Sequence, residues 1–179
     1  MMLASLLLVY RGEPCEVLEE DLKKLEALGL VKGKDITAKG KELVEQILTK
    51  PLTLKGKVVS GDGEGRYYLS LKGYREQVRR KLGFDPFPGT LNVLLDPESS
   101  EKKALLALRR AIVLEGFTEG GRRYGEVLCY PARVMGLEGA VIIPLKTHHP
   151  PEIIEVISPH NLREKLKLKD GDPVEVTVY

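Results

Sequence analysis

A loop with glycine at every second position is the first candidate for chemistry in this sequence. It lies within Val58–Leu69 and contains Gly61, Gly63 and Gly65, followed by Arg66. Glycine adopts backbone dihedrals that other residues avoid, and it leaves no side chain to hold a ligand away from the main chain. Successive N–H groups can converge on an anion, and Arg66 adds a planar, positively charged donor. We interpret the loop as a candidate phosphate-binding site; a hairpin turn with spare glycines is the alternative.

A second candidate is the pair Thr90 and Asn92 in the sequence Gly-Thr-Leu-Asn. Positions two apart on a strand point to the same face, so the hydroxyl and the amide oxygen are predicted to lie side by side while Leu91 enters the core. Two neutral oxygens suit Mg²⁺ only if phosphate oxygens and waters complete its octahedron. The alternative is a polar strand face near solvent.

The third candidate lies in Lys146–Glu155. The adjacent histidines there suggest a metal, but neighbouring side chains diverge and no carboxylate has the expected spacing to them, so we predict an ordinary loop. Thr147 and Glu155 are more informative, because a hydroxyl at the end of one strand and a carboxylate on the next could bind a polar small molecule. Glu155 is expected to face away from its neighbours Ile154 and Val156.

The fourth candidate is a predicted helix start. Ser158 is expected to cap the helix and Pro159 to occupy its first position. Free N–H groups there, with Arg163 one turn further on, would attract an anion. The alternative is a capped helix with a solvated arginine.

Composition indicates a protein of 179 residues with an ordinary apolar core, since 42% of the residues are hydrophobic and 30% are charged. A net charge of +2 is too small to indicate nucleic-acid binding, and we expect none. Cys15 and Cys129 form no C-x-x-C motif, so neither a disulfide framework nor a zinc site is indicated. The apolar run Met1–Tyr10 is too short to span a bilayer, and we expect a cytoplasmic protein without membrane contact.

Residues 1–50 are predicted to form a small α-rich unit. Its expected elements are helices at Met1–Tyr10, Leu18–Leu30 and Ala38–Leu48, the last capped by Thr37, and a hairpin at Val31–Ile36. The segment LEALGLV…ITAKGKELVEQI resembles the closing half of a winged helix-turn-helix domain. The preceding helix is missing, however, and Glu19, Glu20, Asp21 and Glu26 would face the phosphates of DNA. We therefore predict a degenerate winged-helix-like unit that serves packing or dimerisation.

Residues 52–179 are predicted to form the main domain, mainly β with some α. The expected strands are Leu52–Ser60, Tyr67–Leu71, Thr90–Leu95, Ile112–Phe117, Tyr124–Val134, Ala140–Leu145, Ile153–Ile157 and Val174–Val178, and the expected helices are Tyr74–Leu82 and Glu101–Arg110. No helix pattern follows the glycine loop directly, which excludes the Walker A and G-x-G-x-x-G motifs. Many short strands without βα alternation favour a closed or nearly closed barrel.

Four separated motifs of this domain resemble the archaeal CTP-dependent riboflavin kinase family. They are KVVSGDGEGRYYLSL, LGFDPFPGTLNV, GAVIIPLKTHHPPEIIEVISPHNLREKL and LKDGD, in the family's order and at similar intervals. The resemblance implies a six-stranded cradle-loop barrel that transfers the γ-phosphate of CTP to the terminal ribityl hydroxyl of riboflavin, giving FMN and CDP. Some members also carry an amino-terminal helix-turn-helix domain.

The resemblance also implies roles for individual residues. The nucleotide site would comprise Asp62, Gly63, Glu64, Gly65, Arg66, Tyr67, His160, Asn161, Leu162 and Arg163. Thr90 and Asn92 would hold Mg²⁺, and Thr147 and Glu155 would bind riboflavin or FMN. Removal of the hydroxyl proton by Glu155 is a further hypothesis.

Two other classes of function remain open at this point. One is a flavin- or nucleotide-sensing transcription regulator that combines the amino-terminal unit with an inactive barrel, and the other is a purely structural barrel. The clustering of polar side chains at predicted loops and strand ends disfavours the structural barrel. No oligomeric state is indicated by the residues.

Overall fold

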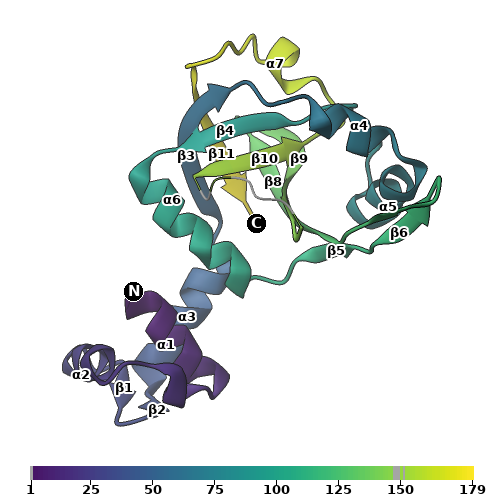
Figure 1. Ribbon diagram of the computed structural model, residues 1–179. Helices are drawn as coiled ribbons and strands as arrows, with labels where there is room; N and C mark the ends of the chain where they lie inside the picture. Colours follow the sequence, from purple (N-terminus) through teal and green to yellow (C-terminus); the bar gives the residue numbers. More distant parts are fainter. Residues whose placement is uncertain (1, 147–149, 151) are drawn as a thin grey trace. The chain divides into compact units, whose positions relative to one another are not determined.

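Two compact units, Met1–Lys50 and Pro51–Tyr179, make up the chain in the computed structural model, which describes residues 2–146, 150 and 152–179 (Figure 1). The division falls beside Pro51, where proline disfavours continuation of the preceding helix. None of the described helices is long and apolar enough to cross a membrane.

The first unit consists of three helices and a short hairpin. Its elements are α1 (Met2–Arg11), a 3-10 turn (Pro14–Glu16), α2 (Glu19–Ala27), β1 (Val31–Lys32), β2 (Asp35–Ile36) and α3 (Ala38–Thr49). Thr37 caps α3 by accepting a hydrogen bond from the backbone N–H of Gly40, as predicted. Its core is formed by Leu6, Leu7, Leu25, Val31 and Val44.

One acidic residue of α2 differs from the expectation of an exposed acidic face. Asp21 is only 8% exposed, and its Oδ2 accepts a hydrogen bond of 2.6 Å from the Ser5 hydroxyl on α1. A buried carboxylate needs such a partner, so Asp21 ties α1 to α2 rather than facing outward. The winged-helix-like character of the unit stays a prediction.

Six antiparallel strands close into a barrel in the second unit, as predicted (Figure 1). They are β3 (Leu52–Val59), β4 (Leu91–Leu95), β8 (Val127–Val134), β9 (Leu137–Pro144), β10 (Ile153–Ile157) and β11 (Pro173–Val178). Their order is β11-β3-β4-β10-β9-β8, and pairing of β11 with β8 completes the circle. Short β5 (Ile112–Leu114) pairs with the other end of β8. Closure removes the free edges that an open sheet would expose.

Alternating apolar side chains fill the barrel. On β3, Leu54 and Val58 are fully buried while Lys55 and Lys57 face solvent, and β11 buries Val174, Val176 and Val178 in the same way. A second apolar cluster lies outside the barrel, beneath two helices and beside β5. Its members are Leu69, Tyr74, Val78, Phe84, Leu114, Tyr124, Val127, Cys129, Ala140 and Ile157.

The predicted strand Tyr67–Leu71 is wrong, because a helix follows the glycine loop. This helix is α4 (Glu64–Ser70). A second helix, α5 (Lys72–Leu82), follows it directly, and the single residue between them, Leu71, has extended backbone dihedrals. Gly63, at φ +85°, is the residue before α4 and takes a left-handed conformation that favours glycine. On this helix Tyr68 packs against the second apolar cluster while Tyr67 stays exposed, and β-propensity depends strongly on such context.

The remaining elements differ from prediction mainly in their bounds. The helix expected at Glu101–Arg110 is α6 (Pro97–Lys103) followed by a 3-10 turn (Ala104–Leu108), and Asp96 caps α6 through its Oδ1. The expected strands Ile112–Phe117 and Tyr124–Val134 are each interrupted. Their inner ends form the separate hairpin β6 (Phe117–Glu119) and β7 (Arg122–Tyr124).

Candidate active site

Each of the three loop positions is occupied by glycine for a different geometric reason. A Cβ on Gly61 would lie 2.0 Å from Asn92 Nδ2, and a Cβ on Gly65 would lie 2.6 Å from Thr90 Oγ1. Gly63 instead supplies the left-handed turn before α4. The loop therefore lies directly on the side chains of Thr90 and Asn92, and larger residues at its outer glycines would separate them. Glycine periodicity and the Thr-x-Asn motif thus belong to one site.

Strands β4 and β10 bring three oxygen-bearing side chains together. Glu155 is paired with Asn92 across these strands, so their side chains share a face. The Thr90 hydroxyl lies 3.1 Å from Glu155 Oε1 and 3.4 Å from Asn92 Oδ1. Ile154 and Val156 are buried on the other face of β10, as expected from alternation.

A cavity of about 450 Å³ opens above these side chains, and we call it the polar cavity. It is bounded by the glycine loop, the start of β4, the end of β10 and the segment before α7 (Leu162–Lys165). Of the residues predicted to bind nucleotide, eight line it: Asp62, Gly63, Gly65, Arg66, His160, Asn161, Leu162 and Arg163. The side chains of Arg66 and Arg163 and the glycine-rich backbone in this lining suit it to a phosphorylated ligand.

Two residues predicted for the nucleotide site are not part of that lining. Glu64 lines a different cavity, and Tyr67 is 46% exposed with its hydroxyl 2.7 Å from that of Tyr124. Both are displaced because α4 begins at Glu64 and rotates successive side chains away from the loop. Thr147, predicted to bind flavin, lies outside the described residues.

The helix start predicted at Ser158 is wrong. Asn161 is the N-cap of α7, and its Oδ1 accepts a 3.3 Å hydrogen bond from the N–H of Glu164. Ser158 is buried, and its hydroxyl donates to the carbonyl of Glu138 at 2.6 Å, on neighbouring β9. The helix therefore begins three residues later than predicted, and its first residues Asn161, Leu162 and Arg163 line the polar cavity.

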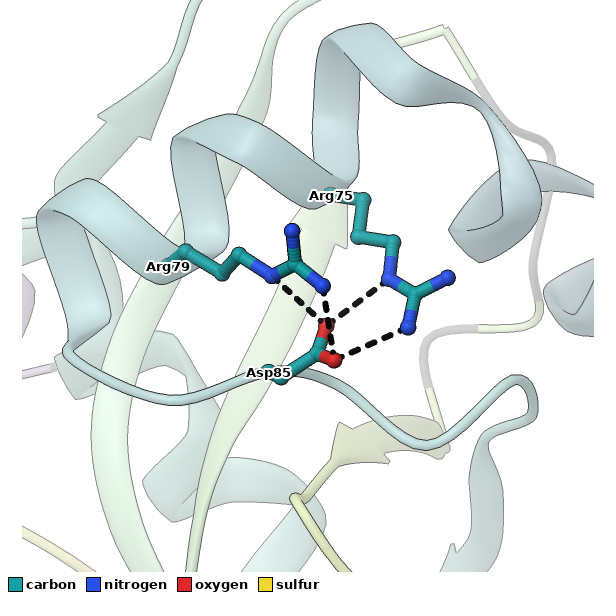
Figure 2. A network of polar contacts seen from close by, with 3 residues as sticks. All are labelled: Arg75, Arg79 and Asp85. Atoms are coloured by element: carbon teal, nitrogen blue, oxygen red, sulfur yellow. Dashed lines mark hydrogen bonds and ion pairs between the residues drawn. The ribbon is translucent and has the colours of Figure 1, made fainter.

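The loop between α5 and β4 contributes Phe87, Pro88 and Gly89 to the polar cavity. It is attached to the barrel through the N–H of Phe87, which donates to the carbonyl of Ser158 at 2.8 Å. Figure 2 shows its second attachment, in which Arg75 and Arg79 of α5 both donate to the Asp85 carboxylate at 2.8–3.0 Å. These hydrogen bonds hold the pKa of Asp85 well below its ordinary value.

A second cavity of about 240 Å³, which we call the aromatic cavity, was missed by the sequence reasoning. Tyr68, Tyr74 and Tyr124 line it together with several aliphatic side chains. Burial raises the pKa of Tyr74, whose hydroxyl donates to the carbonyl of Gly125 at 2.6 Å. Four of the seven tyrosines of the chain lie in or next to this cavity, and they come from segments far apart in the sequence. A flat aromatic ligand suits such walls.

The two cavities meet at Gly65, Thr90 and Glu155, which line both. A ligand in the polar cavity can therefore present a phosphate to a ligand in the aromatic cavity at this shared wall.

The oxygens of Thr90, Asn92 and Glu155 are the hard donors that Mg²⁺ prefers. Among the described residues there is no group of three or more His, Cys, Asp or Glu that could hold a metal ion.

Comparison with known proteins identifies the family. The family model CTP-dep_RFKase, described as domain of unknown function DUF120, matches residues 58–178. The chain is 67% identical over 179 residues to a protein named riboflavin kinase from Ignicoccus hospitalis, covering 99% of this chain and 100% of that protein. It is 47% identical over 184 residues to a riboflavin kinase from Archaeoglobus fulgidus, covering 93% of this chain and 79% of that protein. The chain belongs to the CTP-dependent riboflavin kinase family.

Proposed function

We propose that the protein transfers the γ-phosphate of CTP to the 5′-hydroxyl of riboflavin, giving FMN and CDP. The observation that carries this proposal is the pair of unlike cavities that share a wall at Gly65, Thr90 and Glu155. One cavity suits a nucleoside triphosphate and the other a flat aromatic ring. The point of contact between them is where a phosphate would move.

The polar cavity is assigned to CTP. Backbone N–H groups of the glycine loop and the guanidinium groups of Arg66 and Arg163 would hold the phosphates. Arg66 makes no ion pair with any described residue, which leaves its charge available to a ligand. Phosphoryl transfer depends chiefly on positioning and on neutralising charge, so these contacts supply much of what the reaction needs.

The aromatic cavity is assigned to the isoalloxazine ring of riboflavin. Tyr68, Tyr74 and Tyr124 offer ring faces and edges, and the hydroxyls of Tyr74 and Tyr124 are hydrogen-bonded to Gly125 and Tyr67. The ribityl chain would then extend toward Glu155 at the shared wall, which places its terminal hydroxyl beside the phosphates. Glu155, with Thr147, is the predicted flavin ligand.

Thr90 and Asn92 would hold Mg²⁺ together with phosphate oxygens. When bound, the ion supplies positive charge that neutralises the phosphate oxygens of the transferred group. In the transfer itself the bond from the γ-phosphorus to the β–γ bridging oxygen breaks, and a bond from that phosphorus to the ribityl oxygen forms. Glu155 lines the shared wall, where it would orient that hydroxyl and accept its proton.

The test is FMN formation. Purified protein is incubated with riboflavin, Mg²⁺ and each of CTP, ATP, GTP and UTP in turn, and FMN is separated from riboflavin and quantified. We expect FMN with CTP and much less with the other three. Absence of FMN with all four nucleotides would refute the kinase assignment, and equal yields from all four would refute dependence on CTP.

A pair of arginine variants tests the assignment of the cavity. Arg66→Gln should raise KM for CTP by about tenfold, as expected for loss of one charge-assisted contact to phosphate. Arg80→Gln removes the same charge from an exposed position on α5 outside both cavities and serves as the control. Equal effects of the two variants would indicate general electrostatic attraction rather than a phosphate contact at Arg66.

A further inference from the structure

Asp170 is the common partner of two residues that line the polar cavity. Its Oδ2 accepts a hydrogen bond of 2.6 Å from the Ser60 hydroxyl, and its Oδ1 lies 2.7 Å from Arg163 Nη1. Ser60 precedes the glycine loop and Arg163 lies on α7, so one carboxylate joins two separate segments of the cavity lining. Asp170 itself is not among the residues that line it.

We propose that Asp170 is a positioning residue for the nucleotide: it fixes the direction of the Arg163 guanidinium and the start of the glycine loop before CTP binds. The inference rests on the proposed function. It also gives a role to LKDGD, a motif whose residues lie outside both cavities.

The carboxylate of Asp170 is held by a turn that is itself attached to β3. The N–H of Gly171 donates to the carbonyl of Val58 at 2.8 Å, and the N–H of Val58 donates to the carbonyl of Asp172 at 2.9 Å. Gly171, at φ +89°, supplies the left-handed residue that the turn needs. Asp170 is therefore fixed relative to the strand that leads into the glycine loop.

Arg163 is held at two points, which leaves its orientation little freedom. Besides the contact with Asp170, its Nη2 donates to the carbonyl of Val59 at 2.8 Å. Because both contacts are to groups near the end of β3, the guanidinium of α7 is drawn toward the glycine loop. A side chain that is already ordered loses less entropy when a phosphate binds.

An electrostatic role and a positioning role predict opposite changes in nucleotide affinity when the Asp170 carboxylate is removed. Asp170 offsets part of the positive charge of Arg163, so a purely electrostatic role for Arg163 predicts tighter phosphate binding without Asp170. A positioning role predicts weaker binding. The ion pair is exposed, with 34% of the Arg163 side chain and 52% of the Asp170 side chain accessible, and such pairs contribute little to stability. An effect on nucleotide binding is therefore separable from an effect on folding.

The experiment compares Asp170→Asn with Asp172→Asn, which makes the same change in charge within the same turn. The Asp172 side chain accepts a hydrogen bond from the N–H of Lys169, and that bond does not involve the cavity. Steady-state KM for CTP and for riboflavin, CDP binding by calorimetry and the melting temperature are measured for both variants. Asp170→Asn is then repeated in an Arg163→Gln background.

We expect Asp170→Asn to raise KM for CTP and Kd for CDP by about tenfold, the effect of one lost charge-assisted contact. KM for riboflavin should change by less than about twofold, which is the scatter expected for sites that do not interact. Asp172→Asn should change neither KM value by more than that. In the Arg163→Gln background, Asp170→Asn should add less than about twofold, because the asparagine amide oxygen can still accept the hydrogen bond from Ser60.

Three results would overturn the inference: an unchanged or lower KM for CTP, a parallel rise in KM for riboflavin, or full additivity with Arg163→Gln. A wild-type protein that forms no FMN would instead refute the proposed function. Calorimetry with CDP alone would still test Asp170 in that case, so the two failures are distinguishable.

Discussion

Replacement of Gly61 by alanine adds one methyl group where the glycine loop touches Asn92. The φ angle of Gly61 lies outside the left-handed region, so alanine can adopt the backbone conformation. The three heavy atoms nearest to an added Cβ all belong to the Asn92 side chain. The substitution therefore acts first on this side chain, the one proposed to hold Mg²⁺ with Thr90.

The size of the effect follows from the distances. The added Cβ would lie 2.0 Å from Asn92 Nδ2 and ordinary contact begins at 3.4 Å, so the amide must withdraw by about 1.4 Å, the difference of the two. A displacement of about 1 Å at a reacting centre costs ~10²-fold in rate, or about 2.7 kcal/mol in the barrier. Stability should change little, because an allowed glycine-to-alanine change restricts the unfolded chain and contributes about 0.4–1 kcal/mol in favour of folding.

The assay measures kcat at saturating riboflavin and CTP, the Mg²⁺ dependence of the rate and the melting temperature. We expect Gly61→Ala to lower kcat by about 10²-fold with a near-normal melting temperature. Asn92→Ala supplies the control background: it should lose Mg²⁺-dependent rate by itself, and Gly61→Ala should then cost almost nothing more, since the methyl group no longer meets the amide. A wild-type kcat for Gly61→Ala, or the same loss in both backgrounds, would show that this contact does not position Asn92.

Three further predictions concern other parts of the domain. Glu155→Gln should lower kcat by ~10²–10⁴-fold if the carboxylate accepts the hydroxyl proton, whereas a rate within a few-fold of wild type with weaker riboflavin binding would rule that role out. Tyr68→Ala should raise KM for riboflavin by about 10–100-fold, from ~1.5–3 kcal/mol of lost aromatic contact, and leave KM for CTP unchanged; a rise in both would contradict the separate cavities. Asp85→Asn should lower the melting temperature at pH 7. Because Arg75 and Arg79 depress the pKa of Asp85, its contribution is present above the unfolded pKa of about 3.9 and is lost as pH falls below it, so the two proteins should converge in acid.

The barrel could be predicted from the sequence because its strands follow simple alternation. Residues such as Leu54 and Val58 on β3, or Val174 and Val176 on β11, alternate with polar neighbours and are buried as that pattern requires. Closure of the barrel does not follow from alternation alone. It was predicted from the number of short strands without βα alternation, the resemblance to a known family added the number of six strands, and the pairing of β11 with β8 confirms it.

The errors cluster where packing against another element decides the local structure. Alternation over Tyr67–Leu71 suggested a strand, but α4 covers this segment up to Ser70, and its Tyr68 packs against Tyr124 in the second apolar cluster. Ser158 has the residue type of a helix cap, yet its hydroxyl is used by β9. The aromatic cavity was missed for a related reason: its walls come from segments far apart in the chain, and single-sequence patterns do not bring them together.

The site combines a rigid strand pair, β4 and β10, with a loop around Gly61 that depends on contacts at its ends. Asn92 and Glu155 lie on β4 and β10, which are neighbours within a closed barrel, so the spacing between these side chains is fixed by hydrogen-bonded strand pairing. The loop around Gly61 contributes backbone rather than side chains, and its position depends on contacts at its ends. Asp170 holds the first end through Ser60. A substitution that loosens the loop should therefore act first on nucleotide binding, while one that alters the strand pair should act on the transfer step itself.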